Sequence, residues 1–218
     1  MHITLIGMSN IGKSYWSKRL EAEAGFRRID CDTLIEKWLG QELSELGYQG
    51  IHDVARWMGQ PYEARYAQAS KRYVEVERAV MLDAIATLRK ADPHEPPYVI
   101  DTTGSVIYAG DDVAHELKSL TQVVYIAASS QHVSQLFADY LARPKPVIWS
   151  DTYACARGET LEDALERCYP QLLSSRARLY ERMADVIIPS DRHRDPKATA
   201  HDLFDLGDTP LRQSASAR

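Results

Sequence analysis

Eight residues near the amino terminus have the types and spacing of an anion-binding loop. Segment 7–14 reads Gly-Met-Ser-Asn-Ile-Gly-Lys-Ser and matches the P-loop (Walker A) pattern G-x-x-x-x-G-K-[S/T] throughout. Gly7 and Gly12 let the chain turn tightly, so that successive backbone N–H groups face one anion. Lys13 would reach the β- and γ-phosphates of ATP, and the Ser14 hydroxyl would coordinate a bridging Mg²⁺ ion. The motif therefore predicts nucleotide binding.

The elements around this phosphate loop, residues 7–14, are those that the motif requires. An apolar, β-branched run at 3–6 predicts a strand before the loop, and the spacing of Ile11, Tyr15 and Leu20 predicts a helix after it. The amino terminus of that helix adds a partial positive charge beside the phosphates. A chance match in a glycine-containing turn is the alternative, and the flanking elements argue against it. The residues predicted to contact ATP in this segment are Gly7, Met8, Ser9, Asn10, Ile11, Gly12, Lys13, Ser14 and Tyr15.

Two aspartates follow the second predicted strand, at residues 26–29. Ligands of open parallel sheets lie beyond the carboxyl ends of the strands, so Asp30 and Asp32 should face the phosphate loop. One carboxylate beside a magnesium triphosphate can hold the metal through water, while the other orients or deprotonates an acceptor hydroxyl. Alternatively, Asp32 caps the helix predicted from residue 33. The residues alone leave both interpretations open.

Short apolar runs alternate with helical patterns along the rest of the chain. Further strands are predicted at 98–101, 123–127 and 186–188, and an amphipathic helix is predicted over 73–88. This alternation is typical of parallel sheets covered by helices on both faces. We therefore expect an α/β fold, a three-layer α/β/α sandwich around a mainly parallel sheet of five strands.

The chain is predicted to form one domain over residues 1–207. Within it, segment 41–70 reads as a partly helical excursion from the sheet, because glycine and proline interrupt its pattern. Segment 143–160 is basic, rich in glycine and proline, and suited to a lid that excludes water from phosphoryl transfer. The alternative for it is an ordinary surface loop. The small, polar tail at 208–218 is predicted to be disordered.

Composition limits the partners and the compartment. The net charge of −5 over 218 residues provides no overall attraction to nucleic acid or to anionic lipid. No apolar run reaches the roughly 18 residues of a membrane-spanning helix. The three cysteines lack CxxC spacing and favour reduced thiols. We expect a cytoplasmic protein, a monomer or small homo-oligomer, without nucleic-acid or membrane partners.

The phosphate loop, together with three further segments, resembles the shikimate kinase family. Residues 28–40 read RIDCDTLIEKWLG, similar to the family pattern in which D-x-D leads into I-E and a glycine. Residues 172–185 contain RARLYERMAD, similar to the family's R-x-x-L-Y-x-x-x-A-D segment. Arg143-Pro144 resembles the R-P of the mobile lid. The resemblance implies a P-loop kinase that transfers the γ-phosphate of ATP to a hydroxyl of a small molecule.

The resemblance also implies roles for individual residues. Asp30 would serve Mg²⁺, and Asp32 would contact the acceptor and act as the base. Arg143 would close over the phosphates and act in catalysis with Lys13. Arg176 would bind an anionic group of the acceptor, because a guanidinium pairs well with a carboxylate. The alternative, without the motif, is that Arg176 belongs to a solvated helix face.

The segment after the third strand departs from the family pattern. A glycine triplet that contacts the substrate is reduced here to Gly104, which we still expect to bind the acceptor. Asp101 at the strand end is predicted as a second carboxylate beside the metal, with an acceptor contact or a strand-end cap as alternatives. Val74 stands where the family has a substrate-binding arginine. The acceptor could therefore be shikimate, gluconate, a nucleoside or another polyol. A nucleotide-binding regulatory protein without turnover is the remaining alternative.

Overall fold

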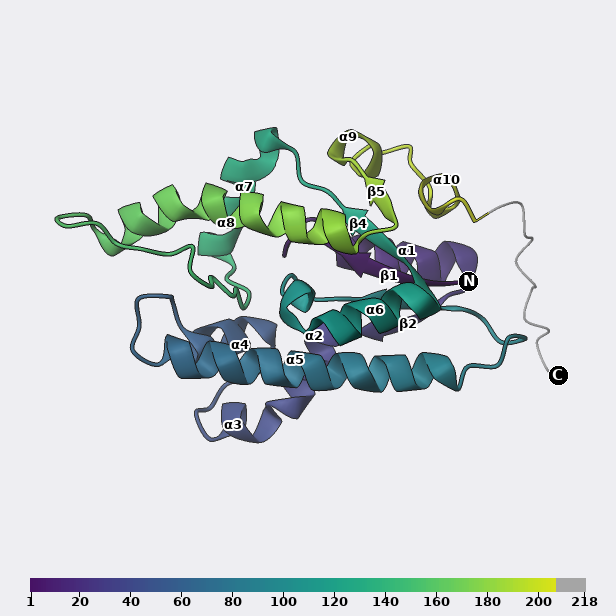
Figure 1. Ribbon diagram of the computed structural model, residues 1–218, viewed down its shortest axis with the longest axis horizontal. Helices are drawn as coiled ribbons and strands as arrows, with labels where there is room; N and C mark the ends of the chain where they lie inside the picture. Colours follow the sequence, from purple (N-terminus) through teal and green to yellow (C-terminus); the bar gives the residue numbers. More distant parts are fainter. Residues whose placement is uncertain (207–218) are drawn as a thin grey trace.

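A single parallel sheet forms the centre of the molecule (Figure 1). The computed structural model describes residues 1–206, so the tail predicted at 208–218 lies outside the described residues. The strand order is β2-β3-β1-β4-β5, and every pairing is parallel. The strands are β1 (His2–Ile6), β2 (Arg27–Asp30), β3 (Tyr98–Asp101), β4 (Thr121–Ile126) and β5 (Val186–Ile188). The predicted α/β fold with five strands is confirmed.

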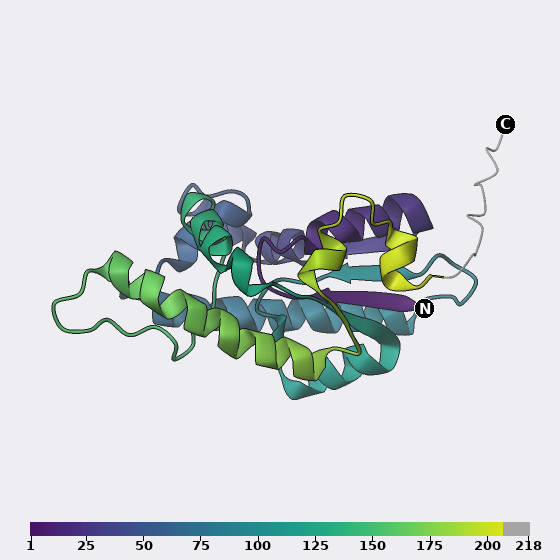
Figure 2. The ribbon, with the colours of Figure 1, turned by 90° about the horizontal axis from the view of Figure 1, so that it is seen from above.

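Helices cover both faces of this sheet (Figure 2). One layer contains α1 (Lys13–Ala24), packed against α10 (Ala200–Phe204), and the opposite layer contains α5 (Tyr66–Arg89), α6 (Asp111–Leu120) and α8 (Leu161–Met183). Because both faces are covered, the side chains of the central strands are buried whichever way they point. This arrangement is the predicted three-layer α/β/α sandwich.

The long helix α5 follows its apolar periodicity. All five residues that define the period are buried: Tyr73, Val76, Val80, Ala84 and Leu88. The helix begins at Tyr66, earlier than the predicted residue 73, and ends at Arg89. Its first turns therefore belong to the segment that the sequence indicated as an excursion from the sheet.

The rest of that excursion forms a small helical group beside α5. The group contains α3 (Gly40–Ser44) and α4 (Ile51–Met58), and it follows α2 (Cys31–Trp38) directly. α4 packs against α2, α3 and α5, with Val54 and Met58 buried at these contacts. The excursion is thus fixed to the edge of the sandwich near the end of β2.

A long connection joins α7 (Val133–Ala142) to α8. Residues 143–160 contain neither helix nor strand, in agreement with the predicted loop. Val147, Ile148 and Trp149 are nevertheless buried, so part of this connection packs into the molecule. The remaining short helices are η1 (Val106–Tyr108), η2 (Ser130–His132) and α9 (Ser190–His193). Within residues 1–206, the structure contains no helix of the length and hydropathy that a membrane span requires.

Candidate functional site

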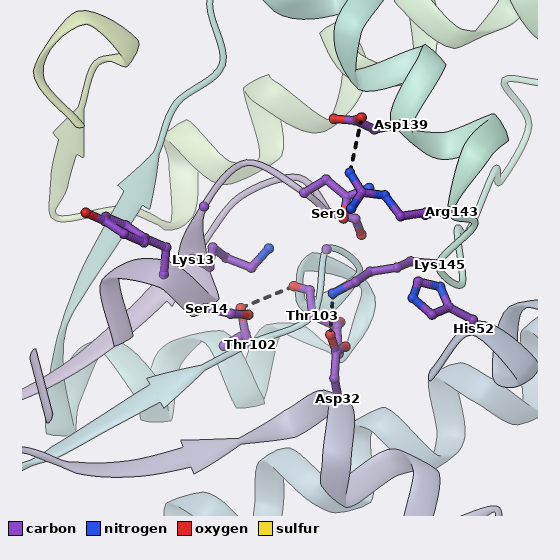
Figure 3. Close-up of a pocket in the computed structure, with 14 residues that line it drawn as sticks. Ser9, Lys13, Ser14, Asp32, His52, Thr102, Thr103, Asp139, Arg143 and Lys145 are labelled. Atoms are coloured by element: carbon purple, nitrogen blue, oxygen red, sulfur yellow. Dashed lines mark hydrogen bonds and ion pairs between the residues drawn. The ribbon is translucent and has the colours of Figure 1, made fainter. Parts of the chain in front are cut away.

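A pocket of about 350 Å³ lies at the carboxyl ends of β1, β2 and β3 (Figure 3). Elements far apart in the sequence contribute to it, as expected for an open parallel sheet. The lining residues are Ser9, Asn10, Gly12, Lys13, Ser14, Tyr15, Asp32, His52, Thr102, Thr103, Gly104, Asp139, Arg143 and Lys145. The structure thus brings most of the residues proposed for the phosphates together with the proposed base.

The phosphate loop has the backbone that its glycines allow. Gly7 has φ +141°, and a Cβ there would lie 2.6 Å from the carbonyl oxygen of Ile126. Gly12 has φ +113° and occupies the N-cap position of α1 without a side-chain hydrogen bond. The first N–H groups of α1 are therefore left without a side-chain cap. Uncapped N–H groups and the helix dipole together favour a bound anion at this end of α1.

Lys13 lies buried at the start of α1, only 5% exposed. Its ammonium group donates to the carbonyl oxygens of Gly7 and Met8, both at 2.8 Å. Burial lowers its pKa to about 8, although the nearby carboxylates of Asp101 and Asp32 act in the opposite direction. The loop carbonyls thus hold the ammonium group that a phosphate would attract.

This pKa predicts how ATP binding depends on pH. Only the protonated form of Lys13 would attract phosphate, and the neutral form predominates above a pKa of about 8. We therefore expect the ATP affinity to fall by up to about tenfold for each pH unit above roughly 8. Titration calorimetry between about pH 7 and pH 9.5 measures this dependence. Lys13→Met provides the control. It lacks the ammonium group, so its weaker ATP binding should not show this dependence on pH. An equal decline in both proteins would assign the effect to another group.

Asp32 faces the pocket from the first turn of α2. Asp30 is the N-cap of this helix, since its Oδ1 accepts from the N–H of Thr33 at 3.2 Å. The alternative that Asp32 caps the helix is therefore wrong, because α2 begins two residues earlier than expected. Asp32 Oδ2 instead accepts a hydrogen bond from Lys145 Nζ at 2.9 Å.

Asp30 and Asp101 share one cation, Arg28, that the sequence analysis did not single out. Arg28 Nη2 lies 2.7 Å from Oδ2 of each aspartate, and the Ser17 hydroxyl also donates to Asp101 at 2.9 Å. Neither aspartate is among the residues that line the pocket. One guanidinium between two carboxylates leaves a net charge of −1. The cluster fits a Mg²⁺ ion held through water better than direct coordination, whereas the Ser14 side chain lies in the pocket itself.

Gly104 lines the pocket in the turn after β3, where this turn passes the phosphate loop. A Cβ at this position would lie 2.8 Å from Ser9 Oγ and 3.0 Å from the Ser9 backbone nitrogen. A larger residue would therefore push the two segments apart. The close approach is a structural reason for a glycine at position 104. The predicted contact of Gly104 with the acceptor stays a prediction.

Arg176 is not brought to the pocket surface. Its side chain extends from α8 into the protein and is 0% exposed. Nη1 donates to the carbonyl oxygen of Gly104 at 3.0 Å, and Nη2 donates to that of Ile148 at 2.5 Å. The solvated-face alternative is wrong, because the guanidinium bridges two backbone segments inside the protein. Its proposed contact with the acceptor stays a prediction.

The other predicted residues divide between the pocket and the core. Tyr15 lines the pocket, whereas Met8 and Ile11 are buried and absent from the lining. Arg143 lines the pocket with a side chain that is 74% exposed, and it lies 3.7 Å from Asp139. The lining residues that sequence reasoning did not propose are His52, Thr102, Thr103, Asp139 and Lys145. They come from loops and helix surfaces without a recognisable motif.

A buried carboxyl group lies behind the pocket wall. Glu77 is 1% exposed, and Thr103, which lines the pocket, donates to its Oε1. Burial raises the pKa of Glu77 to about 7, against the opposing effect of its hydrogen bonds with Thr103 and Ser105. Its Oε2 has no hydrogen-bond partner among the described residues. The other glutamate of α5, Glu75, is exposed.

Solved structures share the fold described above. Shikimate kinase from Acinetobacter baumannii in complex with shikimate aligns with a TM-score of 0.58 and 20% identity, over 94% of this chain and 88% of that chain. The shikimate kinase from Bacteroides thetaiotaomicron gives 0.58 and 18%, over 94% and 96%. The shikimate kinase from Aquifex aeolicus gives 0.51 and 18%, over 94% and 92%. No protein-family model matches the sequence, and neither does any curated protein. The structural similarity confirms a shikimate kinase-like fold.

Proposed function

We propose that this protein is an ATP-dependent kinase that transfers the γ-phosphate to a hydroxyl of a small, anionic acceptor, as shikimate kinases do. One observation carries the proposal: Lys13 and Ser14 of the phosphate loop line the same pocket as Asp32. A phosphate-binding cation and a carboxylate base are thereby available to one reacting centre. A protein that only sensed nucleotides would not need the carboxylate in this pocket.

The phosphate loop and the first turn of α1 would hold the triphosphate. Backbone N–H groups would bind its oxygens, and Lys13 would leave the carbonyls of Gly7 and Met8 to follow the transferred group. The Ser14 hydroxyl would hold Mg²⁺, with Asp30 and Asp101 acting through water. The metal, when bound, neutralises charge that develops on the phosphates. Arg143 would contribute from the lid.

Asp32 would act as the general base. The acceptor hydroxyl would give its proton to Asp32 while its oxygen forms a bond to the γ-phosphorus. The bond between this phosphorus and the β–γ bridging oxygen breaks, and the electron pair leaves with ADP. Lys145 Nζ lies at Oδ2 of Asp32, so the acceptor hydroxyl would either take the place of Lys145 there or bind the other carboxylate oxygen.

An ADP-release assay tests the function. Shikimate is the first acceptor to test, since the similar structure from Acinetobacter baumannii contains it. Gluconate, nucleosides and related polyols follow. We expect acceptor-dependent ADP formation with a small hydroxy acid. ATP binding without acceptor-dependent turnover would favour the regulatory alternative. Failure to bind ATP would overturn the proposal altogether.

The assignment of Asp32 predicts the behaviour of Asp32→Asn. An amide of the same shape cannot take the acceptor proton, so kcat should fall by about 10²- to 10⁴-fold. The Kd for ATP should change less than about threefold, because the proposed partner is the acceptor. Steady-state kinetics and calorimetry measure the two values, with Asp83→Asn on the exposed surface of α5 as the control. Equal losses in ATP binding and turnover would place Asp32 on the metal instead.

A further inference from the structure

The geometry points to Lys145, rather than Arg143, as the lid residue that contacts the transferring phosphoryl group, a catalytic role that rests on the proposed kinase function. Lys145 lines the pocket with a side chain that is 24% exposed. Its Nζ lies 2.9 Å from Oδ2 of Asp32, the proposed base. Because the acceptor hydroxyl would approach Asp32, Lys145 would lie beside the point of phosphoryl transfer.

The position of Lys145 also relates it to Lys13. The positive charge of Lys145 lowers the pKa of Lys13, whereas the charge of Asp32 raises it. Lys13, Asp32 and Lys145 are therefore close enough inside the pocket for their charges to affect one another. Figure 3 shows Lys145 extending toward Asp32 and into the pocket interior. A phosphoryl group between Lys13 and Asp32 would lie within reach of both lysines.

Arg143 has a different environment. Its guanidinium lies 3.7 Å from Asp139, one turn earlier on α7, and its side chain is mostly exposed. A solvent-exposed ion pair of this kind contributes little energy and little positional constraint. Arg143 therefore suits a peripheral contact with the outer phosphates better than a fixed contact at the point of transfer.

The backbone around Lys145 is held firmly by neighbouring side chains. We call residues 144–149 the lid stalk. His52 Nδ1 donates to Pro144 O at 2.9 Å, because the carbonyl can only accept. Tyr66 OH donates to Val147 O at 2.9 Å and accepts from Trp149 N at 2.7 Å. Arg176 Nη2 donates to Ile148 O. The stalk is thus anchored on α4, α5 and α8, which positions Lys145 before any ligand binds.

The ammonium group can exchange partners without losing its charge. It has three N–H donors, of which one serves Asp32 among the described contacts. When the acceptor hydroxyl takes its place at Asp32, these donors can contact oxygens of the phosphoryl group in transit. The acceptor proton moves to Asp32, the new oxygen–phosphorus bond forms and ADP departs with its electron pair. Lys145 transfers no proton in this step, and its ammonium group would stabilise charge in the transition state.

A binding experiment tests this role without an identified acceptor. ADP with Mg²⁺ and aluminium fluoride mimics the transferring phosphoryl group, whereas ADP with Mg²⁺ alone does not. We expect Lys145→Met to raise the Kd of the aluminium fluoride complex by about 10²-fold or more. The Kd of ADP alone should change less than about threefold. Lys145→Arg should retain part of the tight binding, and Lys71→Met, on the exposed surface of α5, should retain all of it.

Four results separate this inference from other possibilities. Equal weakening of both complexes by Lys145→Met would make Lys145 an ordinary nucleotide ligand and overturn the inference. An unchanged aluminium fluoride complex would reduce the Asp32–Lys145 contact to an ion pair without a catalytic role. A lower melting temperature with unchanged binding would make Lys145 structural. A wild-type protein that does not bind ADP would overturn the proposed function itself.

Discussion

Replacing Lys13 by alanine should reduce phosphoryl transfer by more than about 1,000-fold, which corresponds to at least ~4 kcal/mol of transition-state stabilisation. Lys13 is the buried cation of the phosphate loop, and its two carbonyl contacts are the ones it would leave for the phosphates. The charge of Lys13 would follow the moving phosphoryl group. Removal of this charge should therefore lower kcat more than it weakens ATP binding.

The measurement is acceptor-dependent ADP release by Lys13→Ala, together with its circular dichroism spectrum and melting temperature. Lys18→Ala provides the matched control, because Lys18 lies on the same helix with an exposed side chain. It should keep wild-type activity. If Lys13→Ala retained activity within about tenfold, only ~1.4 kcal/mol would be lost, and the phosphate-loop interpretation would be wrong.

Replacing Arg176 by alanine should lower the free energy of unfolding by about 3–5 kcal/mol. The change removes a fully buried side chain and leaves a cavity beside Tyr180 and Tyr108. It also removes the guanidinium donor from the carbonyl oxygen of Ile148, for which a buried unpaired group costs about 1–3 kcal/mol. For a chain of this size, the loss corresponds to a decrease in melting temperature of roughly 6–20 °C.

Urea unfolding measures this change, with Arg178→Ala as the control. Arg178 lies two residues further along α8 and is exposed, so its replacement should change the unfolding free energy by at most about 0.5 kcal/mol. A fully stable Arg176→Ala variant with only a higher acceptor KM would contradict the structural role. It would instead support the acceptor contact implied by the resemblance to shikimate kinases.

The proposed magnesium site and the lid stalk share a feature. In both, an arginine outside the P-loop pattern holds the groups that are proposed to act on the metal or on the phosphate. Arg28 forms ion pairs with both Asp30 and Asp101, so the proposed role of these carboxylates at a metal would be an indirect one. Arg176 binds the lid stalk, so Lys145 is held against Asp32. The same arginines would be overlooked if the site were described by its motif alone.

Local patterns in the sequence determined the phosphate loop and most of the sheet. The loop is recognisable because its glycines, Lys13 and Ser14 act through a continuous stretch of backbone, which a local pattern can describe completely. The strands are recognisable because burial on both faces requires short apolar runs. The five-stranded α/β sandwich followed from the alternation of these runs with helices such as α5, whose period of buried residues is regular.

Only the tertiary structure decided which charged groups meet. The contact between Lys145 and Asp32 joins residues that are 113 positions apart, and that between Arg28 and Asp101 joins residues 73 positions apart. The buried Arg176 donates to Ile148 of the lid stalk, whose residues carry no periodicity. The charge of a side chain follows from its residue type. Which group that side chain contacts depends on how separate elements pack together. The position and backbone of the phosphate loop were therefore predictable from the sequence, whereas the contacts of its neighbours with the lid stalk were not.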